Sequence, residues 1–598
     1  MSCSKSIRML ILTTAACATT ILAANFGAPL YDTSDPLRLL DHENFHRELR
    51  QAPGVYLVQF YNSWCGHCIR FAPTFKKFAA DVSAWRPAVR VGVINCADSA
   101  NGPLCRDNGI EGFPTMKLFW IERGGRGSTN GTSIREREPS GIEDEIVDFI
   151  EARTKDKAVL HDFPSLTPSS ARSLQDIWDS VPTNLKQVFV VVERPSSYVG
   201  RQLILDFNSI KTAAVHRFLR GDGPEELRHQ DHVSLLLLEK GVHPRLIAKE
   251  TDEKKARALF KEKLTELGIS FVHDEHHTTQ ATKAYDLIGD YSKIYLDDIE
   301  TGILYTLTQE VPLKQEISTK QLSILKSFIQ LMYENIDVPP RIRYYLRNVS
   351  NRIDVSVPLK GADFLKLLKA AETPEAYLSP EANFIGCKGS DPGKRGYTCS
   401  LWTIFHYITV GSHAKFLAKK IEYPNLAVLV IKDYVLNFFS CSECRSHFEK
   451  MAANIESELV NANESVLWLW RSHNTVNARL KGDGTEDPAR PKIQFPPMSL
   501  CPECHNGDKF NESNVLKFLG RFYSEQNLVQ SADTRTSPDR IVASTPGAKH
   551  FSGFDLTIFL VIYALSITLL FVVFVTMVCR RRKAACKSVL SSTSASSP

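Results

Sequence analysis

At 598 residues, the chain is too long for a single hydrophobic core and predicts three to five domains. Hydrophobic residues make up 43% and charged residues 23%, which is ordinary for globular proteins. The net charge of +5 is small for this length, and no RNA- or DNA-binding motif is present, so composition argues against a nucleic-acid partner.

The N-terminus has the pattern of a secretory signal peptide. Lys5 and Arg8 precede a mostly apolar stretch that ends in the small residues Ala23 and Ala24. We therefore expect residues 1–24 to be removed on export, and we exclude them from the fold. An uncleaved membrane anchor is the alternative, although the apolar run is short for a membrane span.

Residues 30–154 alternate between strand and helix patterns. Largely apolar runs predict strands over residues 55–61, 89–95 and 116–120. Helical spacing predicts helices over residues 66–80 and 142–152. Such alternation predicts an α/β domain.

A Cys-x-x-Cys motif, Trp64-Cys65-Gly66-His67-Cys68, lies between the first of these strands and the helix that follows. This placement puts Cys65 at a helix N-terminus, where the helix dipole and unpaired amides favour the thiolate. His67 favours the reduced form further, which makes a disulfide at this pair more oxidising. The motif predicts a redox-active dithiol, and half of a zinc site or a purely structural disulfide are the alternatives.

Two other features of this domain bear on the redox pair. Phe113-Pro114-Thr115 opens a predicted strand, where a cis proline would bring backbone against the dithiol for substrate docking. Cys96 and Cys105 enclose eight residues, so we expect them to form a structural disulfide.

Residues 155–385 contain no cysteine, so the thiol chemistry is confined to the two ends of the body. A second α/β domain without redox cysteines is expected over residues 155–287, from strand patterns at residues 188–192 and 232–238 and a helix pattern at residues 253–267. A helix-rich spacer is expected over residues 288–385, with helices at residues 319–333 and 363–371.

Residues 386–527 are again dominated by helical patterns and carry aromatic and polar residues at helical spacing. Trp402 and His406 are four residues apart and share one helix face. A second shared face contains Trp470, His473, Asn474 and Asn477. Burying such a stripe is costly unless something hydrogen-bonds to it. A flat heteroaromatic ligand with phosphates would satisfy these side chains together with Arg395.

Two alternatives compete with a ligand in this segment. A core cluster of Trp, His and Asn side chains without a ligand would use the same residues. Zinc is the other alternative, because paired Cys-x-x-Cys motifs commonly bind it, through Cys441, Cys444, Cys501 and Cys504. Export and the upstream redox motif argue against zinc, so we expect no metal. Cys387 and Cys399 should form a structural disulfide, and Cys501/Cys504 a structural or accessory disulfide in preference to a redox shuttle.

The C-terminal end predicts a membrane anchor. Residues 528–553 are expected to form a polar linker. The 23 residues from 556 to 578 carry no charge, and a basic cluster follows at residues 580–583. This pattern predicts one transmembrane helix over residues 554–579, with the tail 580–598 on the cytoplasmic side. A buried core helix is the alternative, but such helices rarely run this long or end in four cations.

The 14 cysteines agree with export. Those in the signal peptide or at or beyond the inner membrane face are Cys3, Cys17, Cys579 and Cys586. The other ten fall into five close pairs: Cys65/Cys68, Cys96/Cys105, Cys387/Cys399, Cys441/Cys444 and Cys501/Cys504. An even, locally paired set in an exported chain is typical of disulfides. Candidate glycosylation sites in Asn-x-Ser/Thr sequences are Asn130, Asn348, Asn463 and Asn511.

Taken in order, these motifs resemble the quiescin sulfhydryl oxidase family over residues 30–527. Members of that family combine a thioredoxin domain, a redox-inactive thioredoxin-like domain, a helix-rich spacer and an Erv-type FAD domain. The resemblance implies a multidomain α/β plus all-α protein with a helical, Erv-type FAD bundle over residues 386–527. Residues 30–154 resemble thioredoxin domains of the protein disulfide isomerase type, which implies Cys65 as the attacking cysteine and Cys68 as the resolving one.

The resemblance also implies which residues hold FAD. These are Arg395, Trp402, His406, Glu443, His447, Trp470, His473, Asn474, Asn477, Lys492 and Phe495. Two positions depart from the family pattern. Gln59 stands where many thioredoxin domains of this type have a buried glutamate that takes the proton of the second cysteine. Phe495 stands where the family usually has tryptophan, so it can cover the cofactor but offers no indole donor.

The implied activity is that of an FAD-dependent thiol oxidase, which introduces disulfides into secretory-pathway proteins and reduces dioxygen to hydrogen peroxide. Electrons would pass from Cys65/Cys68 to Cys441/Cys444 and then to the flavin. The alternatives are a disulfide isomerase or reductase without flavin, and a non-enzymatic surface glycoprotein. We expect a type I single-pass protein of the Golgi or plasma membrane, with a lumenal or extracellular body that is also shed and secreted.

Overall fold

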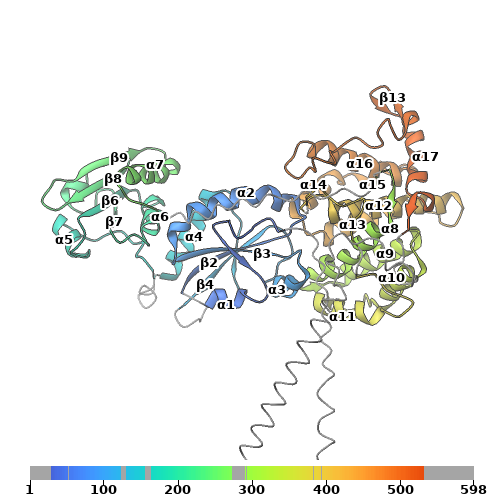
Figure 1. The fold of residues 1–598 in the computed structure, drawn as a ribbon, viewed down its shortest axis with the longest axis horizontal. Coiled ribbons are helices and arrows are strands. Elements are labelled where there is room, and N and C mark those ends of the chain that lie inside the picture. The colour runs from blue at the N-terminus through green and yellow to red at the C-terminus, as the bar shows by residue number, and fades with distance from the viewer. Residues whose placement is uncertain are drawn as a thin grey trace, which may run out of the picture. The chain divides into compact units, whose positions relative to one another are not determined.

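The computed structural model describes most of the chain between the predicted signal peptide and the predicted transmembrane helix (Figure 1). The described residues are 29–50, 53–122, 130–154, 163–271, 290, 292–380, 383–391 and 393–530. The predicted signal peptide and the predicted transmembrane helix over residues 554–579 lie outside these ranges. Among the helices within them, none combines the length and the apolar character needed to cross a bilayer.

Residues 30–154 form a five-stranded sheet with helices on both sides (Figure 1). In spatial order, the strands are β1 (Arg38–Leu40), β3 (Val89–Asn95), β2 (Gly54–Tyr61), β4 (Thr115–Ile121) and β5 (Thr132–Ile134). The helices are α1 (Phe45–Arg50), α2 (Gly66–Asp81), α3 (Gly102–Asp107) and α4 (Pro139–Thr154). The central strand β2 is buried along its whole length, which explains its nearly continuous apolar sequence. All three predicted strands and both predicted helices are present.

The next domain is a four-stranded sheet. Its strands, in spatial order, are β7 (Ala213–Leu219), β6 (Gln187–Glu193), β8 (Val233–Glu239) and β9 (Arg245–Glu250). Its helices are α5 (Leu174–Asp179), α6 (Val199–Asp206) and α7 (Glu253–Glu266). The parallel β6–β7 pair and the antiparallel β6–β8 pair repeat the pairing of β2 with β3 and β4, so the fold confirms the second α/β domain.

A buried cluster of charges joins the two α/β domains. Arg257 of α7 is 6% exposed and pairs with Asp206 of α6 and Glu143 of α4, each at 2.8 Å. Trp85 of the first domain donates its indole N–H to Asp206 at 2.8 Å. The second domain therefore contributes the cation that neutralises a buried carboxylate of the first.

The rest of the described chain is helical. Residues 292–380 contain α8 (Leu296–Tyr305), a π-helical turn (Thr306–Glu310), α9 (Thr319–Asn335), α10 (Pro340–Arg352) and α11 (Gly361–Ala371). Residues 393–530 contain α12 (Gly396–Leu417), α13 (Leu426–Phe438), α14 (Ser442–Met451), α15 (Ile455–Glu458), α16 (Glu464–Leu480) and α17 (Glu512–Phe522). Both helices predicted in the spacer are present, as α9 and α11.

The predicted spacer packs directly into the core of the helical domain that follows. Phe328 of α9 stacks on Tyr434 of α13, with ring centroids 4.0 Å apart. Gly302 brings α8 so close to α12 that an added Cβ would lie 1.8 Å from the Ser400 hydroxyl oxygen. Residues 292–380 therefore share a core with residues 393–530 and are not a mere connection.

Candidate functional site

The first redox pair begins helix α2. Cys65 is the N-cap residue of α2, and Cys65 and Cys68 both carry free thiols that are 0% exposed. Burial, with a further contribution from the Cys65 hydrogen bond, raises the pKa of the Cys68 thiol well above its usual value. The Phe113–Pro114 peptide bond is cis, and the Phe113 carbonyl oxygen lies 3.8 Å from Cys65 Sγ. The expected backbone contact beside the dithiol is therefore present.

Because residue 59 is glutamine, position 59 supplies no carboxylate base for Cys68. Its Oε1 accepts a hydrogen bond from the Tyr31 hydroxyl at 2.7 Å, and its buried Nε2 has no partner among the described residues. Burial keeps the pKa of Cys68 raised, and the backbone hydrogen bond with Asn62 and the charge of Arg137 oppose that rise as smaller contributions. Arg137 reaches this region by donating to the Pro114 carbonyl at 3.2 Å.

The second Cys-x-x-Cys pair lies directly against the first domain. Cys441 and Cys444 form a disulfide at the start of α14. Cys441 forms a parallel β-bridge with Phe113, whose amide donates to the Ser440 carbonyl at 2.9 Å. The Ser442 hydroxyl donates to the Phe113 carbonyl at 2.9 Å. The backbone that precedes the cis proline is thus paired with the segment that carries the second disulfide.

Trp64, the residue before Cys65, is inserted into an aromatic socket on the helical domain. Its indole N–H donates to the Tyr305 hydroxyl at 2.6 Å, and its ring stacks on Phe439 with centroids 5.4 Å apart. Tyr397 meets the same ring edge-on at 5.1 Å. With these contacts, Trp64 is only 6% exposed.

Glu443 lies at this domain contact and does not line the cavity described below. Its carboxylate pairs with Arg70 of α2 at 2.6 Å and lies 3.7 Å from His67 Nδ1. Arg70 also pairs with Asp483 at 3.3 Å. These side chains are about 20–30% exposed, so each pair adds only about 0–1 kcal/mol. The expected role of Glu443 in cofactor binding finds no support in this geometry, because Arg70 turns its carboxylate toward the first domain.

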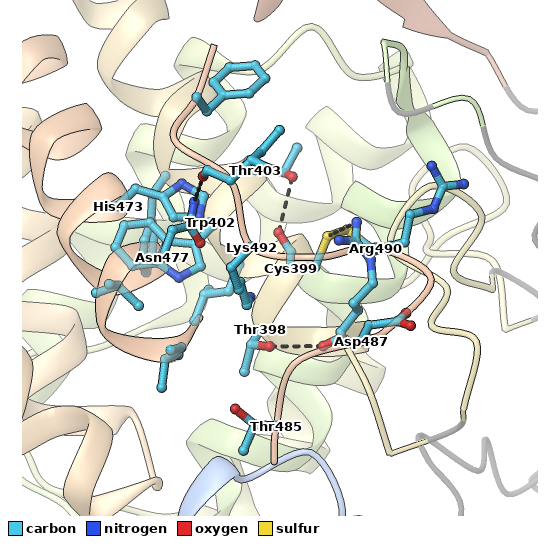
Figure 2. Close-up of a pocket in the computed structure, with 18 of the residues that line it drawn as sticks. Thr398, Cys399, Trp402, Thr403, His473, Asn477, Thr485, Asp487, Arg490 and Lys492 are labelled. Carbon is cyan, nitrogen blue, oxygen red and sulfur yellow. Dashed lines mark hydrogen bonds between the residues drawn. A yellow bond between two sulfur atoms is a disulfide. The ribbon is translucent and has the colours of Figure 1, made fainter. Parts of the chain in front are cut away.

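A cavity of about 750 Å³ lies behind the second disulfide (Figure 2). The expected site residues that line it are Arg395, Trp402, Cys444, His447, His473, Asn477, Lys492 and Phe495. Sequence reasoning missed others, among them Asp298, Thr398, Thr485, Asp487 and Arg490. Figure 2 shows Trp402, His473 and Asn477 on one side of the cavity and Asp487 and Arg490 on the other. Its volume is typical of a site for a cofactor-sized ligand.

One wall of the cavity is a flat aromatic surface. His473 stacks on Trp402 with ring centroids 4.2 Å apart and an interplanar angle of 6°. His406 lies behind this pair, and its Nε2 is 3.1 Å from His473 Nδ1. Burial lowers the pKa of His406 to about 3 and that of His473 well below its usual value, so both rings are neutral at physiological pH.

The polar side chains of the α16 stripe form hydrogen bonds mostly with backbone groups of this chain. Trp470 Nε1 and Asn474 Nδ2 donate to the Phe495 carbonyl at 2.5 and 2.8 Å, and Asn474 Oδ1 accepts from the Phe495 amide. Asn477 donates to the Ile493 carbonyl at 3.1 Å. Trp470 and Asn474 therefore hold the segment that walls the cavity and do not face it, because backbone groups supply the partners that we expected from a ligand.

The opposite side of the cavity gathers positive charge. Burial, reinforced by repulsion from Arg395, lowers the pKa of Lys492. Burial, with repulsion from Arg490, also lowers the pKa of Arg395, and its buried Nε has no partner among the described residues. Arg395 has a φ of 60°, a strained conformation that persists only where surrounding structure requires it. Cations crowded in this way fit an anionic group such as a phosphate.

Comparison with known proteins relates this geometry to a family. The sequence matches the thioredoxin family over residues 37–146, the family of flavin adenine dinucleotide (FAD)-dependent sulfhydryl oxidases over residues 290–390, and the Erv1/Alr family over residues 399–496. It is 33% identical to sulfhydryl oxidase 1 of Gallus gallus, over 85% of this chain and 69% of that relative. It is 32% identical to sulfhydryl oxidase 1 of Homo sapiens, over 84% of this chain and 68% of that relative.

The chain belongs to the sulfhydryl oxidase family. A solved structure, the sulfhydryl oxidase fragment of human QSOX1, is 35% identical and covers 41% of this chain and 100% of that fragment, with a TM-score of 0.38. The protein is therefore an FAD-dependent thiol oxidase. The cavity fits FAD, because it combines a flat ring surface with crowded cations and the orphaned polar atom Arg395 Nε, whereas His406 lies behind the lining.

The remaining cysteines form the disulfides that short spacing favoured. Cys96 pairs with Cys105, and Cys387 pairs with Cys399 at the start of α12. Cys501 and Cys504 form a third Cys-x-x-Cys disulfide, and both are 0% exposed. Their role, structural or accessory, stays a prediction.

The four candidate glycosylation sites differ in exposure. Asn130 and Asn463 are exposed, whereas Asn348 and Asn511 are half-buried. Asn511 caps α17 by accepting from the Asn514 amide, and Asn348 donates to the Ala371 carbonyl. Their modification stays a prediction.

Asp298 is expected to make stability depend on pH. It accepts from the amides of Ile385 and Cys387 at 2.6 and 3.0 Å beside Arg395, and burial nevertheless raises its pKa from 3.8 to about 7. Because the folded state favours the protonated carboxyl, this stabilisation is complete below about pH 4 and is lost as the pH rises through about 7.

Thermal unfolding of the ectodomain at pH 5.0 and 7.5 tests this. Asp298→Asn should reduce the fall in Tm between these two pH values by a few degrees. Asp363→Asn, at an exposed carboxylate of α11, is the control and should leave the fall unchanged. An equal fall in the parent protein and in Asp298→Asn would contradict the prediction.

Proposed function

We propose that electrons enter this oxidase at Cys65 and Cys68 and reach the FAD cavity through Cys441 and Cys444. A substrate thiolate attacks Cys65 Sγ of the oxidised pair, and Cys68 leaves as a thiolate. A second substrate thiolate then attacks the substrate sulfur of the mixed disulfide and releases Cys65. The substrate gains a disulfide, and the first pair is left reduced.

The second exchange moves the two electrons between the domains. The Cys65 thiolate attacks Cys441 Sγ, the Cys441–Cys444 bond breaks, and Cys444 leaves as a thiolate. Cys68 then attacks Cys65 Sγ and releases Cys441, so the first pair is oxidised again and the second is reduced. The roles within the second pair follow from position, because Cys441 is bridged to Phe113 whereas Cys444 lines the cavity.

The residues of the cavity would hold FAD and keep its ring beside Cys444. Arg395 and Lys492 would neutralise the phosphates, and the Trp402–His473 pair would lie against a flat ring. When bound, FAD supplies a two-electron acceptor that is reoxidised by dioxygen, with hydrogen peroxide as product. Because His406 and His473 are neutral, this pair adds no positive charge at the cavity wall.

The bridge between Phe113 and Cys441 is the observation that carries this route. In thioredoxin domains the backbone before the cis proline is where a substrate cysteine docks, and here the second redox pair occupies that place. The two dithiols therefore need no further carrier between them.

Replacing Cys65 by serine tests the route. The variant should lose at least about a hundredfold in oxidation of a reduced protein, because the entry nucleophile is gone. Oxidation of a small dithiol that reaches Cys441 and Cys444 directly should continue, and FAD absorbance should be unchanged. The oxidation of reduced protein is measured by thiol titration. A variant that oxidises reduced protein as fast as the parent would refute entry at Cys65.

We further propose that the substrates are reduced proteins of the secretory pathway and that the body lies in the lumen or outside the cell. The signal-like N-terminus, the local cysteine pairs and the uncharged segment from 556 to 578 support this. A type I anchor in the Golgi or plasma membrane, with shedding of the body, is consistent with the polar linker ahead of that segment. Alkaline extraction of membranes from cells that express the full chain or residues 1–553 tests it. Only the full chain should stay with the membrane pellet.

A further inference from the structure

Glu310 is a buried carboxylate at the contact between the two redox pairs. It ends the π-helical turn Thr306–Glu310 and is 2% exposed. Its two oxygens accept from the Ser440 amide at 2.7 Å and from the Ser440 hydroxyl at 2.9 Å. A single residue, the neighbour of Cys441, thus satisfies both oxygens of this carboxylate.

Burying the Glu310 carboxylate in these surroundings costs free energy. Burial raises its pKa to about 7, and it in turn raises the pKa values of the neighbouring Tyr305, Tyr397 and Tyr434. Arg445 and Lys314 lower its pKa only as weaker contributions, behind burial and the two Ser440 hydrogen bonds. Burying a carboxylate without a cation in direct contact, as here among the described residues, costs free energy that an apolar residue would not.

Glu300 in the same helical segment shows the ordinary arrangement. It is 1% exposed, and its carboxylate pairs with Arg341 at 2.5 Å. Glu300 is therefore a buried structural ion pair that, in the described part of the chain, makes no hydrogen bond to Ser440 or Phe113, whereas Glu310 holds a backbone segment one residue from a reacting cysteine.

A short series of contacts leads from Glu310 to the entry cysteine. Glu310 fixes Ser440 through its amide and hydroxyl. The carbonyl of Ser440 accepts from the Phe113 amide at 2.9 Å, and the Phe113 carbonyl lies 3.8 Å from Cys65 Sγ. Apart from the bond between the Ser440 hydroxyl and Glu310, each contact in this series involves backbone at one or both ends.

We propose that Glu310 is a positioning residue for the exchange between the two redox pairs, holding the Ser440–Cys441 segment where Cys65 can attack Cys441. This inference rests on the proposed route through Cys65 and Cys441. It assigns to residues 288–385, expected from the sequence only as a spacer, an indirect part in electron transfer, through the position of Ser440. Positioning of this kind can change a rate by a hundredfold, because an error of about 1 Å removes the attack geometry.

Trapping the mixed disulfide tests the proposal without relying on turnover or on FAD content. In a Cys68→Ser, Cys444→Ser background, glutathione disulfide oxidises the Cys65 and Cys441 thiols to one interdomain disulfide and releases two glutathione molecules. Mass spectrometry measures the fraction of protein that is trapped at each ratio of reduced to oxidised glutathione. The ratio that traps half of the protein gives the effective concentration of one thiol at the other.

Glu310→Ala in this background should lower that effective concentration at least about tenfold. Glu310→Gln should restore most of it, because an amide oxygen still accepts from the Ser440 N–H. Glu300→Gln is the matched control, a buried carboxylate of the same segment. It should lower Tm by leaving Arg341 without its charge partner but keep the parent trapping ratio.

The outcomes separate the inference from the route on which it rests. If the parent background forms no Cys65–Cys441 disulfide, the proposed route itself is wrong. If it forms the disulfide and Glu310→Ala traps equally well, Glu310 does not position Cys441. Equal losses of trapping in Glu310→Ala and Glu300→Gln would also overturn the inference, because both would then act only through stability.

Discussion

Cys444→Ser should abolish oxygen consumption driven by a dithiol while FAD stays bound. Cys444 is the half of the second pair that lines the cavity, so its loss removes the sulfur from which electrons reach the cofactor. We expect turnover to fall by about a thousandfold or more, as for other essential nucleophiles. The measurement is oxygen-electrode turnover per bound flavin, with the visible spectrum as the record of cofactor content.

The third Cys-x-x-Cys pair supplies the control for that experiment. A Cys501→Ser, Cys504→Ser variant removes a buried disulfide that we expect to be structural or accessory. Its yield and stability should fall, but the folded fraction should keep turnover per flavin close to that of the parent. Sustained peroxide production by Cys444→Ser would show that electrons bypass the second pair.

Arg257→Met should strongly destabilise the α/β part of the molecule. The guanidinium pairs at 2.8 Å with Asp206, Glu143 and Asp81, which come from both α/β domains. Methionine fills much of the same volume but removes the cation from buried Asp206 and Glu143, although Lys261 still lies 3.9 Å from Asp206. Breaking a buried pair in this way costs about 3–5 kcal/mol of unfolding free energy.

Urea unfolding followed by tryptophan fluorescence measures that cost, since Trp85 donates to Asp206 within the cluster. Arg194→Met is the matched control, because Arg194 pairs with Glu253 at 2.5 Å but its side chain is 56% exposed. The control should lose no more than about 1 kcal/mol. Similar losses in the two variants would show that the buried cluster contributes no more than a surface pair.

Local patterns in the sequence were sufficient for the redox chemistry of the first pair. A buried strand followed by a helix places Cys65 at the N-cap of α2, and the cis bond at Pro114 puts the Phe113 carbonyl beside it. The disulfides Cys96–Cys105 and Cys387–Cys399 also follow from proximity along the chain. Such features depend on backbone periodicity and short loops, which neighbouring residues determine.

The partners of long-range polar groups were decided by the tertiary structure alone. The stripe on α16 was correctly placed on one helix face, but only the fold shows that Trp470 and Asn474 bond to the Phe495 backbone. Likewise, Glu443 has Arg70 as its partner across 373 residues, and Glu310 has Ser440 across 130.

The physical reason is that a donor or carboxylate in a sequence has many chemically equivalent partners. Burial and packing of the whole chain select one of them. The sequence by itself therefore determined which chemical groups this oxidase has and which of them share a helix face or a short loop. Only the packing of the helical segment against the first thioredoxin domain places Tyr305 in contact with Trp64 and Glu310 in contact with Ser440, next to the two redox pairs.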